Sequence, residues 1–249
     1  MSTGTLILSP RHGEDTQLLA AAARAAGWTL HRLQRWRLDG PPPEPPVAIY
    51  GEPLFVEVIA DALGLELCRP DLDWLARLPE PHRRREVRFT SLGAARRLDR
   101  PRFIKPADDK AFAARVYPTG AELPHYPGLE DDLPVLVAEP VHFELEARCF
   151  VHGRALATAS IYARDGALAQ ADDGTWPWGQ DEQGGALACV HALLADPAVA
   201  LAPALVVDVG RIRGRGWAVV EANPAYGSGL YGCDPTAALT VVARACQRP

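Results

Sequence analysis

The chain has 249 residues, of which 48% are hydrophobic and 23% charged, the composition of an ordinary globular protein with one large domain or two modest ones. Its formal charge of −5 argues against a general nucleic-acid-binding protein, and no apolar run approaches the roughly 20 residues of a membrane span. Five scattered cysteines without a CxxC pair fit reduced thiols, and the N-terminus lacks the pattern of a signal peptide, so we expect a cytoplasmic protein.

The first third of the chain alternates short apolar runs with helical patterns. Two helices are expected, at 14–27 and 52–64, and each ends at a glycine. Strands separated by helices predict a small parallel α/β unit. The expected strands are 5–8, 28–33, 47–50 and 65–68.

The second of these helices has an apolar face. Leu54, Val58 and Ala62 follow one another at helical spacing, with Phe55 and Ile59 beside them. We expect this face to be buried.

From about residue 86 the pattern changes to strands joined by short turns, which predicts an antiparallel α+β part. Only two long helices interrupt it, near 181–195 and 235–246, and Asp234 followed by Pro235 is a favourable helix start. The expected strands have the sequences RFIKP, AARVY, PVLVAEP, HFELEARCFVHG, RALATASIYAR, ALVVDVGRI and GWAVVEANP.

The last two of these strands flank the glycine-rich turn RGRG and predict a hairpin. With residues 213–216 as the loop, Ile212 pairs with Trp217, and Asp208 then lies directly opposite Glu221. Asn223 points to the same face as Glu221, because side chains alternate along a strand.

Two carboxylates directly opposite each other repel, and the valines around them indicate poor solvation. A divalent cation removes the repulsion. Two carboxylates and an amide oxygen suit Mg²⁺, which commonly takes phosphate oxygens as its other ligands. The alternative is that one acid points to water and a loop of different length shifts the register.

The run 142–153 alternates strictly, so that Glu144, Glu146 and Arg148 share one face. A solvated strand face has the same pattern, and both interpretations stay open at this point.

The only two lysines, Lys105 and Lys110, lie within six positions of each other in a chain that otherwise uses arginine. Lysine is a compact point charge and arginine a broad planar fork, so retained lysines indicate a narrow site such as one that binds nucleotide phosphates. Chance clustering is the alternative.

These segments, in this order, resemble the ATP-grasp superfamily, and most of all its branch of small stand-alone proteins of bacteria and phages. The resemblance rests on FIKPADDKAF, VLVAEPVHFELEARCF and VVDVGRIRGRGWAVVEANPAYGSGLYG. It implies an ATP-grasp fold, with an α/β pre-domain and two α+β lobes that enclose a nucleotide cleft. The implied division is 1–85 for the pre-domain and 86–249 for the ATP-grasp domain, with a small lobe at about 86–138 and a large lobe at about 139–249.

The resemblance also implies site residues. Lys105 corresponds to the lysine that reaches the ATP phosphates, and Lys110 is placed for a second phosphate contact. The segment Glu139, Pro140 and Val141 resembles the hinge that reads the adenine edge, while Glu144 would hold the ribose. The remaining roles are Arg148 at the γ-phosphate or acyl phosphate, and Asp208, Glu221 and Asn223 on Mg²⁺.

The implied activity is ATP- and Mg²⁺-dependent ligation of a carboxylate to an amine or thiol, on a peptide, a protein terminus or a small acid. Its chemistry depends on positioning and on charge neutralisation. The alternatives are a kinase on the same scaffold, a nucleotide-binding module without turnover, and a metal-dependent hydrolase. Neither nucleic acid nor a membrane is expected as a partner.

Two segments receive a weaker interpretation. The basic run 82–88 is interpreted as a solvated face, with binding of an acidic or phosphorylated substrate as the alternative. The segment 118–128 is a candidate for a short lid over the phosphates.

Overall fold

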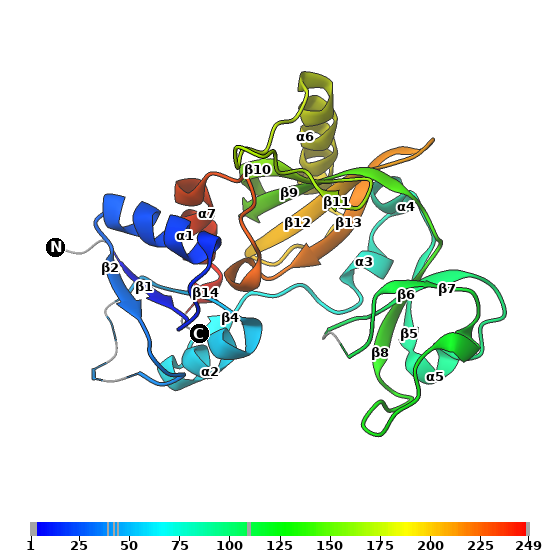
Figure 1. The fold of residues 1–249 in the computed structure, drawn as a ribbon, viewed down its shortest axis with the longest axis horizontal. Helices are drawn as coiled ribbons and strands as arrows, with labels where there is room; N and C mark the ends of the chain where they lie inside the picture. Colours follow the sequence, from blue (N-terminus) through cyan, green and yellow to red (C-terminus); the bar gives the residue numbers. More distant parts are fainter. Residues whose placement is uncertain (1–3, 39, 42, 44, 109–110, 248–249) are drawn as a thin grey trace.

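The computed structural model describes residues 4–38, 40–41, 43, 45–108 and 111–247. Figure 1 shows three sheets along the molecule: a parallel sheet near the N-terminus, a central sheet built mainly from the second half of the chain, and a smaller antiparallel sheet. Within the described part of the chain, no helix combines the length and apolar character needed to cross a membrane.

The N-terminal unit is the parallel α/β unit that the sequence predicts. Strand β1 (Thr5–Leu8) lies between β2 (Thr29–Arg32) and β3 (Val47–Tyr50), and both pairings are parallel. Helix α1 (Glu14–Ala25) connects β1 to β2, and α2 (Pro53–Leu63) follows β3. All residues of β1 and β3 are buried, the pattern of parallel strands covered on both faces.

The run 65–68, expected as a fourth strand of this sheet, pairs elsewhere. Strand β4 (Glu66–Leu67) pairs antiparallel with β14 (Cys246–Gln247), at the far end of the chain. The expectation was wrong about the partner, because an apolar run does not encode where a distant segment returns.

A second correction concerns the face of α2 that is buried. Phe55 and Ile59 are fully buried in the N-terminal core, as expected, and Val56 is buried beside them. Leu54, however, is 59% exposed and Val58 is 39% exposed. The buried stripe of the helix is therefore rotated by about one residue from the predicted one, and Leu54 and Val58 face outward.

Two short helices lead from the N-terminal unit into the smaller antiparallel sheet. They are α3 (Trp74–Arg77) and α4 (Glu80–Arg83). The first strand of that sheet, β5 (Val87–Ser91), was missed because it begins within the basic run. The order is β5-β8-β6-β7, and α5 (Leu92–Ala95) packs on it. The other strands are β6 (Arg102–Pro106), β7 (Arg115–Tyr117) and β8 (Pro134–Ala138).

The central sheet has five strands in the order β11-β10-β9-β12-β13, and its pairings are antiparallel as predicted. Helix α6 (Gln180–Ala195) covers one face. The strands are β9 (Phe143–His152), β10 (Ala155–Arg164), β11 (Ala167–Leu168), β12 (Ala204–Ile212) and β13 (Gly216–Asn223).

The two faces of the central sheet belong to different hydrophobic cores. Cys149 and Val207 pack in the core beneath α6, whereas Phe150 and Val206 pack in the N-terminal core. Helix α7 (Pro235–Val242) also joins the N-terminal core, and Asp234 caps it as predicted, although the helix ends before the expected residue 246. The division at residue 85 remains a prediction.

The orientation of α2 is testable with neighbouring substitutions. Phe55→Ala is expected to lower the free energy of unfolding by about 3–5 kcal/mol, because it opens a cavity in the core. Leu54→Ala should change it by about 0.5 kcal/mol, because the side chain is mostly in water. Urea denaturation followed by circular dichroism measures both, and equal losses in the two variants would contradict the observed orientation.

Candidate functional site

The β12–β13 hairpin places Asp208 directly opposite Glu221, as the sequence predicts. It does so through two differences that cancel. The turn has three residues, so Ile212 pairs with Gly216 and not with Trp217. A β-bulge between the Asp208 and Val209 pairs then inserts one residue into β13 and restores the expected register.

The facing carboxylates are neutralised by two cations from other strands. Arg148, opposite Asp208 on β9, forms a bidentate ion pair with it, with Nε 2.9 Å from Oδ1 and Nη2 2.7 Å from Oδ2. Lys105 on β6 donates its ammonium to Glu221. Asn223 Nδ2 lies 2.9 Å from Glu221 Oε1 and 3.4 Å from Asp208 Oδ2, so the three predicted ligands converge.

Burial and charge act against each other in this group. Burial raises the pKa of Asp208, which is fully buried, and the guanidinium of Arg148 opposes that rise. Burial also opposes ionisation of Glu221, but Lys105 and Asn223 outweigh it and leave the pKa of Glu221 below its ordinary value. The pKa of Arg148 is raised, because the contact with Asp208 outweighs the burial of the guanidinium.

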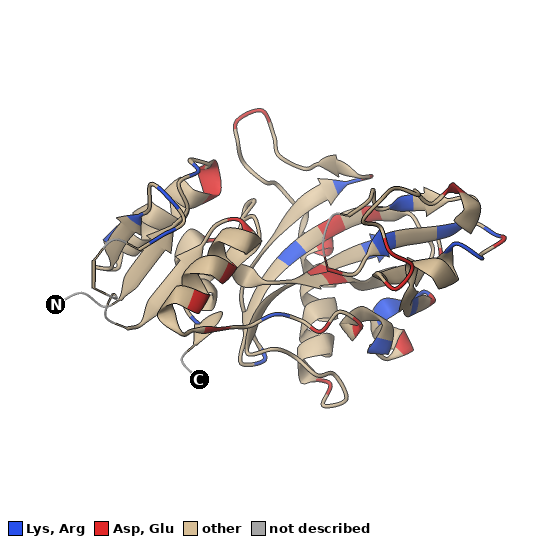
Figure 2. Ribbon diagram, turned by 90° about the horizontal axis from the view of Figure 1, so that it is seen from below, with Lys and Arg blue, Asp and Glu red and all other residues tan. Residues whose placement is uncertain are grey.

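The group borders a cleft with a volume of about 830 Å³. Lys105, Arg148, Glu221 and Asn223 line it, and Asp208 lies buried beneath them. Figure 2 shows acidic and basic positions close together on the strands of the central sheet. The cleft is also lined by Pro53 and Glu57 of α2, residues 69–72, 105–108 and 112–114, and the loop 226–229.

The chemistry of the donors fits a hard divalent cation that also binds phosphate. Within the described residues, no cluster of three His, Cys, Asp or Glu side chains could hold a metal by itself. The set therefore depends on the amide of Asn223 as its third member, with the remaining positions left for oxygens of a ligand.

The other predicted residues are not gathered at this point. Glu139 forms a bidentate ion pair with Arg215, which lowers the pKa of Glu139. Glu144 is the extra residue of a bulge in β9 and binds Arg211 and Arg213. Neither glutamate is among the described residues that line the cleft.

Three further predicted residues complete the comparison with the sequence. Pro140 and Val141 lie in the connection from β8 to β9. Lys110 lies outside the described residues.

The proposed lid, 118–128, packs on the smaller sheet. Leu123 is buried in its core, and an added Cβ at Gly120 would lie 2.1 Å from the carbonyl oxygen of Ala95. The described residues of this segment do not line the cleft; residues 105–108 and 112–114 do so instead.

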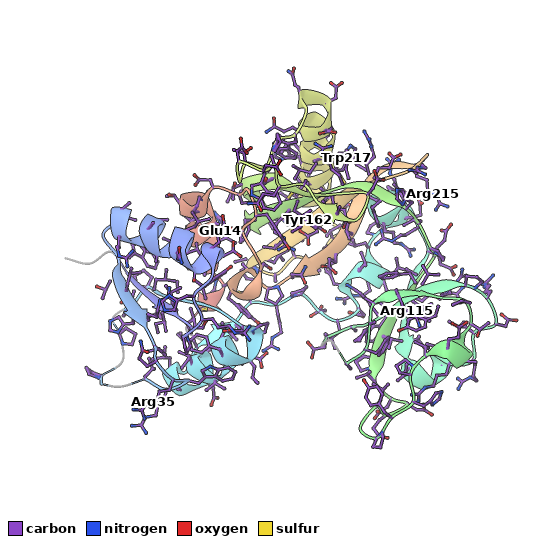
Figure 3. All side chains as sticks on the ribbon, in the orientation of Figure 1. Glu14, Arg35, Arg115, Tyr162, Arg215 and Trp217 are labelled. Carbon is purple, nitrogen blue, oxygen red and sulfur yellow. The ribbon has the colours of Figure 1, made fainter. Side chains whose placement is uncertain are left out.

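An aromatic group around Arg148 was missed from the sequence. The guanidinium lies 4.8 Å from the ring centroid of Tyr231 and 5.3 Å from that of Tyr162, and the two rings stack. Tyr162, labelled in Figure 3 over the central sheet, donates its hydroxyl to Glu146 at 2.7 Å. The alternation of Glu146 with Arg148 placed both on this face, but nothing local indicated which aromatic residues would cover them.

The basic run 82–88 is not the solvated face that was expected. Arg85 is 7% exposed and donates to backbone carbonyls of β13. Arg84 and Arg215 exchange hydrogen bonds with each other's carbonyl oxygens. The run is thus bound to the hairpin that carries Glu221.

This fold, with two antiparallel sheets flanking a charged cleft and a parallel unit beside them, is the ATP-grasp fold. A family model described as an ATP-grasp domain, family 2 of its clade, matches residues 82–241, more than half of the chain, and the chain belongs to this family. The fold predicted from the sequence is confirmed.

Solved structures with similar folds support the same conclusion. The RimK domain ATP-grasp protein of Sphaerobacter thermophilus DSM 20745 is 18% identical, with a TM-score of 0.55 over 97% of this chain and 98% of that chain. The ATP-grasp ligase PsnB, complexed with minimal precursor, Mg and ADP, is 14% identical, with a TM-score of 0.51 over 98% and 99%. The D-alanine–D-alanine ligase of Bacillus anthracis, complexed with ATP, is 11% identical, with a TM-score of 0.51 over 98% and 97%. A comparison with curated proteins gives no match.

The ion pairs change what Asp208→Asn should do. From repulsion alone, the sequence predicts an intact or slightly stabilised fold. The substitution instead leaves Arg148 buried without its countercharge, so we expect a loss of about 3 kcal/mol in the free energy of unfolding. Glu221→Gln should lose about 1 kcal/mol, because its side chain is 32% exposed.

Chemical denaturation at neutral pH measures both losses, with Asp61→Asn on the exposed side of α2 as the control. An Asp208→Asn protein as stable as the wild type would show that Arg148 does not depend on this partner.

Proposed function

We propose that this protein is an ATP- and Mg²⁺-dependent ligase that joins a carboxylate to an amine or thiol through an acyl phosphate. The acid is a peptide, a protein terminus or a small molecule. The observation that carries the proposal is the convergence of Lys105, from one sheet, and Arg148, from another, on the facing carboxylates Asp208 and Glu221 at one cleft.

Asp208, Glu221 and Asn223 would hold the magnesium. Bound there, the ion supplies neutralisation of the charge on the phosphate oxygens. These three side chains already approach one another, and two of them face the cleft, so the chain provides the ligands without a rearrangement of its backbone.

Lys105 and Arg148 would contact the phosphates. The ammonium of Lys105 rests on Glu221, and binding of nucleotide would move it to phosphate oxygens. Arg148 is fixed by Asp208, by the carbonyl of Gly229 at 3.0 Å and by two aromatic rings. It is therefore suited to hold a transferring phosphoryl group in one orientation. Lys110 remains a proposed second phosphate contact.

The adenine would lie at Glu139–Val141. The N–H of Glu139 donates to Glu86 at 2.9 Å, and Pro140 has no N–H, so the N–H of Val141 is the donor that this segment offers to a purine edge. Glu144 would bind the ribose hydroxyls by exchanging them for Arg211 and Arg213.

The reaction proceeds in two displacements. A carboxylate oxygen of the substrate attacks the γ-phosphorus, and the bond from phosphorus to the β–γ bridging oxygen breaks, which releases ADP and leaves an acyl phosphate. The amine or thiol then attacks the carbonyl carbon, inorganic phosphate leaves, and the nucleophile loses its proton. Arg148 would stabilise the negative charge of the phosphoryl group in both steps.

Hydroxylamine distinguishes this reaction from phosphorylation of a hydroxyl on the same scaffold. Incubation of the protein with ATP, Mg²⁺ and a library of acids and peptides should yield hydroxamate together with ADP, because hydroxylamine intercepts an acyl phosphate. Ferric-chloride colour and mass spectrometry detect the product. A stable phosphoester without hydroxamate would identify a kinase instead, and absence of nucleotide binding would leave no enzyme of either kind.

The shape of the cation at residue 105 provides a second test. Lys105→Arg keeps the charge but adds a broad planar group beside Glu221, so we expect ADP formation to fall by about 100-fold or more. Lys105→Met, which removes the charge, serves as the reference for complete loss. Activity of Lys105→Arg close to that of the wild type would rule out a site that requires a point charge.

A further inference from the structure

The bulge in β13 decides which side of the central sheet Glu221 faces. Below the bulge, Val209 pairs with Val219; above it, Asp208 pairs with Glu221, so Val220 is the inserted residue. Without that insertion Asp208 would lie opposite Val220. Glu221 would then turn to the face covered by α6, because one residue of slip reverses every side chain of a strand.

A bulge interrupts the ladder of backbone hydrogen bonds, and Arg85 binds the carbonyls at this interruption. Its Nη1 donates to Val219 O at 2.7 Å and its Nη2 to Val220 O at 3.0 Å. The guanidinium also lies 5.1 Å from the centroid of the Phe143 ring and is almost completely buried. A planar fork suits two neighbouring carbonyls, because its donors are fixed relative to each other.

Arg85 lies in the chain segment that leads into the smaller sheet, between α4 and β5. The segment that leaves that sheet is bound to the same hairpin, because Glu139 holds Arg215 and the N–H of Arg213 donates to His142 O. Figure 3 shows Arg215 near α4 at the end of the hairpin. Both connections between the two sheets are thus fastened to β12–β13, and Arg85 is fastened at the bulge.

We propose that Arg85 is a positioning residue for the cation site: by holding the carbonyls of Val219 and Val220 it fixes the bulge that turns Glu221 toward Asp208. The proposal rests on the function proposed above, since it requires a divalent cation at these carboxylates. Arg85 touches neither nucleotide nor metal, and it acts through the backbone of β13. A merely structural Arg85 would affect the stability of the protein but not its metal dependence.

The test is a titration of ADP binding by calorimetry at a series of Mn²⁺ concentrations, in wild-type protein and in Arg85→Met. We expect the Mn²⁺ concentration for half-maximal enhancement of ADP affinity to rise by about 10-fold or more in the variant, a size typical for loss of an outer-shell partner. ADP affinity without metal should stay within about twofold, because no nucleotide contact is removed.

Arg84→Met is the matched control. Arg84 is the neighbouring arginine and also binds the hairpin, but at the turn carbonyl of Arg215 instead of at the bulge. Its Mn²⁺ dependence should stay within about twofold of the wild type. Arg85→Lys keeps a donor and should shift the Mn²⁺ dependence by only about threefold, since an ammonium is not a fixed fork.

The outcomes separate this inference from the proposed function. Wild-type protein whose ADP binding ignores Mn²⁺ overturns the cation site, and this inference with it. Enhancement in the wild type that persists unchanged in folded Arg85→Met overturns the role of Arg85 alone. If Arg85→Met does not fold, Arg85→Gln is titrated in its place, and an unshifted Mn²⁺ dependence there overturns the role equally.

Discussion

The organisation of this protein depends on a fully buried aspartate that faces a glutamate across a β-hairpin. Like charges so placed repel, and a low-dielectric environment strengthens that repulsion. The chain compensates for it with Arg148 from the neighbouring strand and Lys105 from another sheet. The site is a neutral quartet of two acids and two bases, and each base is of the kind that binds phosphate. Arrival of a cation and a polyphosphate would exchange partners within the quartet without leaving a charge buried alone.

The loop after the hairpin joins this group to the N-terminal unit. Gly229 lies where an added Cβ would be 3.2 Å from Asp15 Oδ2 of α1 and 3.7 Å from Nη1 of Arg148. The carbonyl of the same glycine accepts from Arg148, and Ser228 O accepts from Tyr50 at the end of β3. A side chain at this position would crowd both contacts. The glycine-rich sequence therefore has a packing reason, which is the close approach of two units to one arginine.

The basic run before β5 shows how composition can mislead. Four arginines in seven residues suggest a solvated surface, yet Arg85 is buried against backbone carbonyls. Burying a guanidinium is costly unless its donors are satisfied, and a bulge supplies unpaired carbonyls for them. The cost on one segment thus offsets an interruption on another, and the two connections between the sheets share the hairpin as a common support.

The sequence alone determined the features that depend on local periodicity. Alternating apolar runs predicted the strands, Gly-rich RGRG predicted the hairpin, and the Asp208–Glu221 opposition followed, although the true turn is one residue shorter and Val220 restores the register. The tertiary structure decided what local pattern does not encode: the pairing of β4 with β14, the orientation of α2, and the positions of Glu139 and Glu144 beside arginines of the hairpin. It also decided that the acids are neutralised from far along the chain, by Arg148 at a separation of 60 residues and by Lys105 at 116. Periodicity is a property of neighbouring residues, whereas each of these contacts depends on where distant segments meet in the folded chain.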